Sequence, residues 1–308
     1  MDGHQGGGSL AEFLRARRSV TPPEQVGLLY GGNRRTPGLR REEVAMLAGV
    51  STDYYVRLEQ GRERNPSDQV LDALGRVFAL DTDALAYLYR LVHRRSGSRR
   101  SAGARTERAG TGVLRLLDAW PHTPAHVLGR RLDVLGGNAL GRALFSVMER
   151  DTNLLRFMFL DPVARDFYGA WNEVAEDAVA ALRAGVGDDL DDPRLIGLVG
   201  ELSLKSRDFC RLWARHDVRA KTHATKSFRH PQAGGFTLAH ESFSVNSAPG
   251  QQLVVYRAEP NTPAEEALRL LGTLAAGPGT GPGDPVRQAA GRPKGFDINP
   301  EREEVHPL

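Results

Sequence analysis

Three polar side chains near the N-terminus are spaced so that a single helix would present them together: Thr52, Asp53 and Arg57. An arginine can donate two hydrogen bonds to guanine, and an aspartate can accept one from the amino group of cytosine. A threonine can contact the methyl group of thymine or a phosphate oxygen. We therefore take these three residues as candidate contacts to DNA bases.

Two short helical patterns, broken at Gly49-Val50-Ser51, would position these side chains. Gly49 tolerates the left-handed backbone of a tight turn, and the Ser51 hydroxyl can cap the second helix. The pattern predicts a helix-turn-helix whose second helix turns its polar face to a major groove. An ordinary helical hairpin in a globular core fits the same periodicity. The apolar positions are Val44, Leu47 and Ala48, then Val50, Tyr55 and Leu58.

The flanking residues add a resemblance to known proteins. Residues 41–62, which end in Leu-Glu-Gln-Gly-Arg, resemble the Cro/repressor-like DNA-binding domain. Residues 34–43 and 51–55 are similar to the N-terminal part of the MmyB-like transcription regulators. The repressor-like resemblance implies phosphate contacts from Arg41, Ser51, Gln60 and Arg62. For Arg41 the alternative is an ion pair with a glutamate in its own helix.

Composition limits the class of protein. The 308 residues have room for about two domains, and no run approaches the ~18 apolar residues of a membrane span. Residues 1–9 are polar and glycine-rich and lack the apolar core of a signal peptide, so we expect a cytoplasmic protein. The single cysteine, Cys210, excludes an intramolecular disulfide. Its apolar helical surroundings predict a buried side chain.

The formal net charge of +3 is distributed unevenly. Residues 1–100 contain 16 arginines against 12 acidic residues, a net charge of +4. The other 208 residues contain 25 basic against 26 acidic residues, a net charge of −1. The basic excess therefore lies with the helix-turn-helix, where it suits a surface that faces phosphates.

Helical patterns between residues 10 and 93 predict five helices in the order of the repressor-like fold, with Asp81 as the cap of the fifth. Residues 94–110 are predicted to be an arginine-rich linker, which could contact the DNA backbone or serve as a solvated tether. Residues 1–9 and 276–308 are expected to be flexible ends, because they are rich in glycine, proline or charge.

Residues 111–275 predict a second domain of a different class. Two short strands are expected within residues 123–135, and three more near residues 219–228, 236–245 and 251–258. Helical patterns fill the interval, including one long apolar stripe that begins after Asp161-Pro162 and includes Val163 and Ala178. We expect an α+β fold in which an antiparallel sheet carries helices on one side.

Aromatic residues of the second domain could line a ligand pocket or fill its core. Aromatic stripes at helical spacing suit both, because pockets are themselves mostly apolar. The histidines lie too far apart in sequence for a metal site, so we expect neither a metal nor a cofactor. The candidate pocket residues are Phe157, Phe159, Phe167, Trp171, Phe209 and Trp213, with His216 as a polar handle.

The second domain resembles the ligand-binding domain of the same MmyB-like family. The resemblance implies a PAS-like fold with a cavity for an apolar ligand such as a fatty acid, coupled to DNA binding. The matching segments are residues 125–131, 138–144, 159–162, 213–219, 228–231 and 253–260.

Three classes of function fit these patterns. The first is a ligand-responsive regulator that binds a double-stranded DNA operator as a homodimer, with two recognition helices in successive major grooves. The second is a DNA-binding repressor whose C-terminal domain only dimerises. The third is an enzyme with a DNA-binding domain appended. We do not expect an enzyme, because the sequence has no dinucleotide or phosphate loop, no nucleophile elbow and no clustered triad.

Overall fold

A computed structural model of the chain describes residues 10–28, 36–93, 107–148, 152–186, 192–219 and 223–276. The N-terminal segment of residues 1–9, the linker residues 94–106 and the tail residues 277–308 lie outside the described residues, so the predictions made for them remain predictions.

The N-terminal domain contains the five α-helices that the sequence predicts. A 3-10 helix at Pro23–Val26 follows the first. The apolar faces of the five helices share one core, in which Phe13, Tyr55 and Tyr87 are fully buried. Removing such large side chains from water is the main force that holds short helices together. The helices are α1 (Leu10–Val20), α2 (Arg41–Ala48), α3 (Thr52–Glu59), α4 (Asp68–Val77) and α5 (Thr82–Val92).

The turn between α2 and α3 has the geometry that its residues predict. Gly49 ends α2 with a φ of 70°, in the left-handed region that glycine adopts at little cost. The Ser51 hydroxyl then accepts a hydrogen bond of 3.1 Å from the Tyr54 N–H and caps α3. Asp81 caps α5 in the same way, through the Ala84 N–H at 2.8 Å.

A five-stranded antiparallel sheet forms the centre of the C-terminal domain, which confirms the predicted α+β class. The first strand lies between the second and the fifth, so the last strand in the sequence pairs with the first strand of the domain's first hairpin. The strands are β1 (Ala125–Leu128), β2 (Val134–Gly137), β3 (His223–His230), β4 (Gly234–Ser244) and β5 (Gln252–Arg257), in the order β2-β1-β5-β4-β3.

Helices cover both faces of this sheet rather than one. On β5, Val254 and Tyr256 join the main core, whereas Leu253 and Val255 face the opposite way and pack with Leu117 of the helix before β1. The helices of this domain are α6 (Thr111–Asp118), α7 (Ala139–Leu144), α8 (Leu154–Leu160), α9 (Val163–Phe167), α10 (Trp171–Val186), α11 (Pro193–Lys205), α12 (Arg207–Ala214) and α13 (Pro263–Ala276).

The apolar stripe after Asp161-Pro162 forms two helices, α9 and α10, and not one. The break falls where the chain meets β3: Tyr168 forms an isolated bridge with Phe228, and the Gly169 N–H donates to the Ser227 carbonyl at 2.9 Å. A Cβ at Gly169 would lie 2.9 Å from that of Ser227, so a glycine allows this close approach.

Two further features differ from the sequence expectations. Cys210 is exposed, because its neighbours Phe209 and Leu212 occupy the buried face of α12 and turn the cysteine outward. The C-terminal helix α13 was not predicted as a separate element, although its buried residues Ala264, Ala267, Leu268 and Leu271 follow helical spacing.

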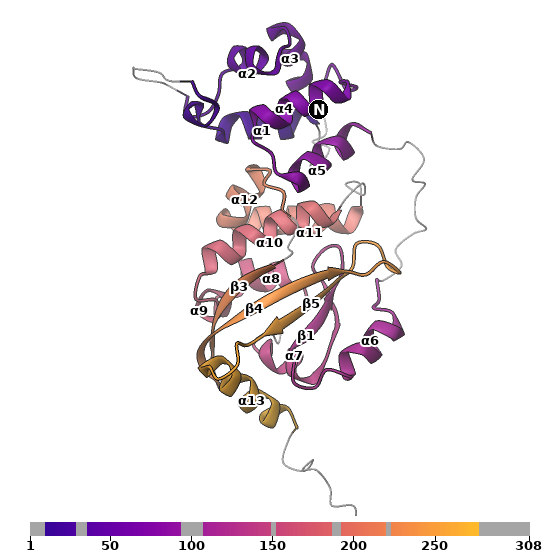
Figure 1. The fold of residues 1–308 in the computed structure, drawn as a ribbon, viewed down its shortest axis with the longest axis vertical. Helices are drawn as coiled ribbons and strands as arrows, with labels where there is room; N and C mark the ends of the chain where they lie inside the picture. Colours follow the sequence, from indigo (N-terminus) through magenta and orange to yellow (C-terminus); the bar gives the residue numbers. More distant parts are fainter. Residues whose placement is uncertain are drawn as a thin grey trace, which may run out of the picture.

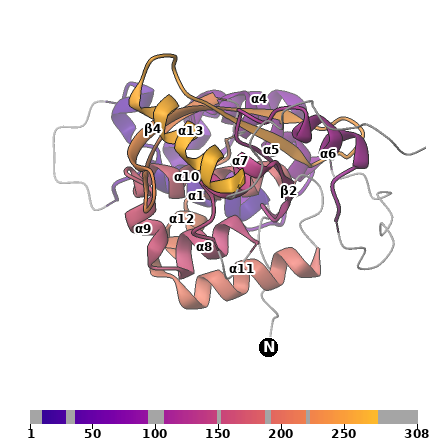
Figure 2. The same cartoon turned by 90° about the horizontal axis from the view of Figure 1, so that it is seen from below.

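The two domains lie one above the other along the long axis of the molecule (Figure 1). Helices α10 and α12 lie between the N-terminal domain and the sheet, and α13 lies at the far end. Seen from that end, α13 lies in front of the sheet, and α11 runs along one side of the molecule (Figure 2). The C-terminal domain therefore presents a helical layer to the helix-turn-helix domain.

Candidate DNA interface and ligand cavity

The polar face of α3 is exposed along its length. Thr52, Asp53 and Arg57 are all solvent-exposed. An Asp53 carboxylate oxygen accepts a hydrogen bond of 3.0 Å from Arg57 Nη1, one helical turn further on. The Arg57 guanidinium also lies 5.9 Å from the centre of the Tyr54 ring. The structure thus brings the three predicted base-contact residues together on one surface.

The other end of α3 carries a buried carboxylate, Glu59, which is 2% exposed. It accepts hydrogen bonds from Arg18 Nε at 2.5 Å, from Arg41 Nε at 2.7 Å and from the Tyr55 hydroxyl at 3.0 Å. Burial alone would raise the pKa of Glu59, but the bonds from Arg18 and Arg41 outweigh it and lower that pKa. The carboxylate therefore joins α1, α2 and α3 as an ion.

The residues predicted to contact phosphates lie at the two ends of α3 and on the neighbouring helix α2. Arg41 makes its ion pair across to Glu59 on α3, not within its own helix, and about half of its side chain stays exposed. Gln60 and Arg62 are exposed just beyond α3, and Ser51 is exposed at its start. Their positions at both ends of α3 suit backbone contacts that flank a base-reading face.

A cavity of about 350 Å³ lies in the C-terminal domain between the first hairpin, α7 and the start of α8. Its walls are largely apolar, with His126, Arg142, Ser146 and Thr152 as polar residues. The His126 ring meets Phe145 edge-on at 5.2 Å. The cavity is lined by His126, Val134, Gly136, Gly137, Gly141, Arg142, Phe145, Ser146, Met148, Thr152 and Leu154.

The seven candidate pocket residues lie elsewhere in the same domain. Phe157 borders a separate hollow of about 400 Å³ with Met148 and Leu160. Phe167 packs behind the cavity wall, with its ring 5.8 Å from that of Phe145. The remaining five are buried or half-buried: Phe159, Trp171, Phe209 and Trp213 in α8, α10 and α12, and His216 in the turn that follows α12.

The residues that line the cavity carry a weaker signal in the sequence. His126 and Phe145 lie in segments with strand and helix patterns, but nothing in their spacing separates lining from core. Three glycines, Gly136, Gly137 and Gly141, border the cavity. A Cβ at Gly141 would clash with the Ala125 carbonyl oxygen, so a glycine allows α7 to approach β1 closely.

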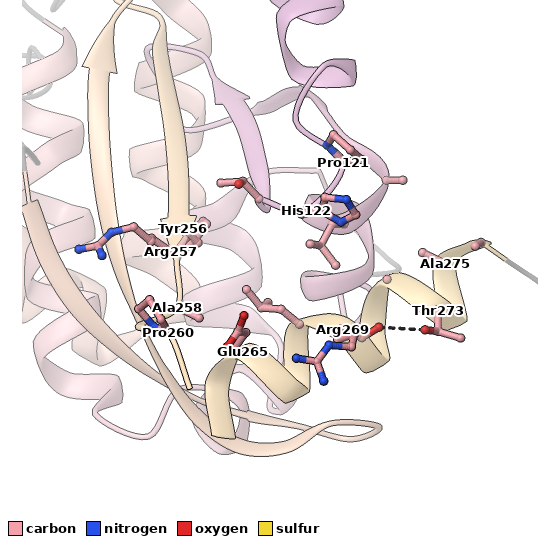
Figure 3. Close-up of a pocket in the computed structure, with 16 residues that line it drawn as sticks. Pro121, His122, Tyr256, Arg257, Ala258, Pro260, Glu265, Arg269, Thr273 and Ala275 are labelled. Atoms are coloured by element: carbon pink, nitrogen blue, oxygen red, sulfur yellow. Dashed lines mark hydrogen bonds between the residues drawn. The ribbon is translucent and has the colours of Figure 1, made fainter. Parts of the chain in front are cut away.

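A larger hollow, of about 960 Å³, lies at the far end of the domain. Among the residues that line it are His122 from the loop before β1, Arg257 from the end of β5 and Arg269 from α13 (Figure 3). Its mixture of charged and apolar groups suits an apolar ligand less well than the smaller cavity does.

Within the described residues, no group of three His, Cys, Asp or Glu side chains could hold a metal ion. Likewise, among the described helices none is long and apolar enough to cross a membrane.

A helix-turn-helix joined to an α+β domain that holds an apolar cavity indicates a DNA-binding transcription regulator. The family described as the MmyB-like transcription regulator ligand binding domain matches residues 109–271, and a helix-turn-helix domain family matches residues 9–88. The first match alone covers more than half of the chain, so the protein belongs to the MmyB-like transcription regulators. No curated protein matches the chain.

Proposed function

We propose that this regulator reads a specific operator with α3 and senses a small apolar, fatty-acid-like molecule in a PAS-like C-terminal domain. The observation that supports the DNA half most strongly is the exposed polar face of α3 on a buried ionic support. Glu59 holds α3 to α1 and α2, so the base-reading side chains project from a rigid helix.

On this proposal Arg57 bonds a guanine, Asp53 accepts from a cytosine amino group and Thr52 contacts a thymine methyl. The ion pair between Asp53 and Arg57 holds the guanidinium over the helix before DNA arrives. Phosphate contacts from Arg41, Ser51, Gln60 and Arg62 would fix the register of α3 on the duplex.

Replacing Arg57 tests the base-reading role. An operator would first be selected from random duplexes with the full chain. Arg57→Ala should then lose about 1–3 kcal/mol of binding free energy on the operator and less on random DNA. Arg229→Ala, which removes an exposed arginine from the sheet, is the charge-matched control. Equal losses on operator and random DNA would show that Arg57 contacts only the backbone.

For the ligand half, we propose the cavity of about 350 Å³ as the site. An acyl chain would lie against Phe145, Met148 and Leu154, with its polar end near His126 or Arg142. In this arrangement Phe157 and Phe167 support the wall from behind and do not form it.

Filling the cavity tests this site. Val134 lines the cavity, so Val134→Phe should abolish binding of a fatty acid such as dodecanoate in native mass spectrometry of the purified full chain. Val163→Phe is the matched control, because Val163 is 44% exposed on α9. Retained binding in Val134→Phe would place the ligand elsewhere.

We propose further that the regulator acts in the cytoplasm as a homodimer, with two α3 helices about 34 Å apart in successive major grooves. The same mass spectra report the oligomeric state. Unchanged operator affinity at saturating fatty acid would favour the alternative, a repressor whose C-terminal domain only dimerises.

A further inference from the structure

One segment of the C-terminal domain, residues 213–219, packs against the helix-turn-helix domain, and we call it the docking segment. Val218 is 4% exposed and belongs to the hydrophobic core of the N-terminal domain. The His216 ring lies 6.4 Å from that of Phe13 on α1, at 75° to it. Arg17 of α1 donates a hydrogen bond of 2.9 Å to the Asp217 carboxylate. Three successive residues of the segment thus contact the other domain.

The backbone of the docking segment is shaped for this contact. His216 has a φ of 53°, in the left-handed region that a non-glycine residue rarely occupies. This turn follows the end of α12 at Ala214 and directs the chain to α1. Arg215, on the other side of Asp217, holds the same carboxylate through Nε at 2.9 Å. The strained turn is therefore fixed from both domains.

Beneath the segment lies a buried arginine, Arg183 of α10, with no exposed surface. Its guanidinium lies 3.8 Å from the Trp213 ring centre and donates a hydrogen bond of 2.7 Å to the Trp213 carbonyl. Burial lowers the pKa of Arg183, whereas Tyr87 of α5 and Glu12 of α1 act in the opposite direction. Since a guanidinium stays charged in proteins, groups of the N-terminal domain help to balance this buried charge.

A row of aromatic rings leads from the docking segment toward the cavity. Trp213 stacks on Phe209 at 5.8 Å, and Phe209 meets Phe159 edge-on at 5.2 Å. Phe159 lies near the C-terminal end of α8, and the first residue of that helix, Leu154, lines the cavity. Because a close-packed interior transmits strain, displacement of Leu154 would shift Phe159 and the rings behind it.

We infer that the docking segment is the site at which the C-terminal domain holds the DNA-binding domain, and the contact through which the cavity acts on it. The coupling to the cavity rests on the proposed function. Docking uses α1 and α5 and leaves α3 on the opposite side, free for DNA (Figure 1). It fixes the direction of α3 relative to the C-terminal domain. Release of the contact would therefore change the distance between the two α3 helices of a dimer, so that they no longer match the spacing of the operator half-sites.

Replacing Val218 tests the docking. Val218→Ser should weaken the contact while each domain keeps its own fold, because Val218 is the residue of the docking segment that is buried in the N-terminal core. Amide exchange in α1 and α5 should accelerate at least tenfold, and operator affinity of the full chain should fall at least fivefold. Val163→Ser, at an exposed valine, should change neither by more than twofold. Arg17→Gln, which removes only the ion pair, should give smaller changes in the same direction.

Unchanged exchange and affinity in Val218→Ser would overturn the docking role. The cavity arm uses dodecanoate: it should shift the operator affinity of the native chain at least threefold and that of Val218→Ser by less than half as much. An equal shift in both proteins would overturn the coupling. If dodecanoate does not bind the native chain but Val218→Ser still weakens operator binding, docking stands, and the coupling and the proposed ligand class both fail.

Discussion

Two buried charged groups, Glu59 at the end of α3 and Arg183 at the domain junction, differ in how fully hydrogen bonds compensate their charge. Glu59 accepts bonds from two arginines and a tyrosine, and its pKa is lowered despite burial. Arg183 donates to one carbonyl, while its Nε and Nη1 have no hydrogen-bond partner of normal geometry among the described residues, although Tyr87 lies near enough to act on its pKa. Burial dominates at Arg183 and lowers its pKa.

The difference separates a fully bonded buried charge from an incompletely bonded one. A fully bonded ion pair is costly to break, so α3 keeps one position on its domain. A buried charge with incomplete bonding contributes little to stability, because its desolvation is not fully offset by hydrogen bonds. On the proposed function, α3 reads DNA from a fixed support, and the contact between the domains is the part that responds to the ligand.

The largest effect should follow the loss of the Glu59 charge. Glu59→Gln leaves Arg18, which is mostly buried, without its anionic partner, so the free energy of unfolding at pH 7 should fall by about 3 kcal/mol. Glu63→Gln, just beyond α3, is the control. Urea unfolding measures both, and a loss below about 1 kcal/mol would mean that the cluster does not fix α3.

A smaller loss of stability should follow acidification, through His216 at the domain junction. Burial, and then Arg183, Arg17 and Arg15, lower the pKa of His216 from its ordinary 6.5 to about 3. The unfolded chain therefore binds a proton that the folded chain rejects, and stability present above pH 6.5 is lost as the pH falls toward 3. The loss should reach about 2 kcal/mol at pH 5. His216→Gln should remove that part of the slope in pH-dependent melting, and an unchanged slope would contradict the shifted pKa.

The smallest effect on stability should follow the removal of the Arg183 charge. Arg183→Met keeps an apolar contact with Trp213, and the Trp213 carbonyl still accepts from the His216 N–H. Stability should stay within about 1 kcal/mol of the native value or rise, because a poorly bonded buried charge is lost. A loss as large as that of Glu59→Gln would erase the distinction between the two sites.

The helix-turn-helix could be predicted from sequence because its determinants are local. A glycine turn, a serine cap and apolar residues one turn apart specify two helices and the face that α3 exposes. Local spacing also indicated the strands, and only their order in the sheet required the structure.

The residues that line the cavity and those that form the junction could not be predicted, because both sets depend on contacts between distant segments. Whether Phe209 packs in a core or lines a pocket is decided by Phe159 and Trp213, which meet it only in the fold. Glu59 meets Arg18 across 41 residues, and Arg17 meets Asp217 across 200. Such pairings leave no periodic trace in the sequence.

The central claim is that the cavity and α3 are coupled through the junction. Calorimetric titration of dodecanoate into the full chain, with and without saturating operator DNA, tests it most directly. Coupling is reciprocal, so DNA should change the dissociation constant of dodecanoate by the same factor, at least threefold, by which dodecanoate changes that of DNA. Equal dissociation constants with and without operator would contradict the account.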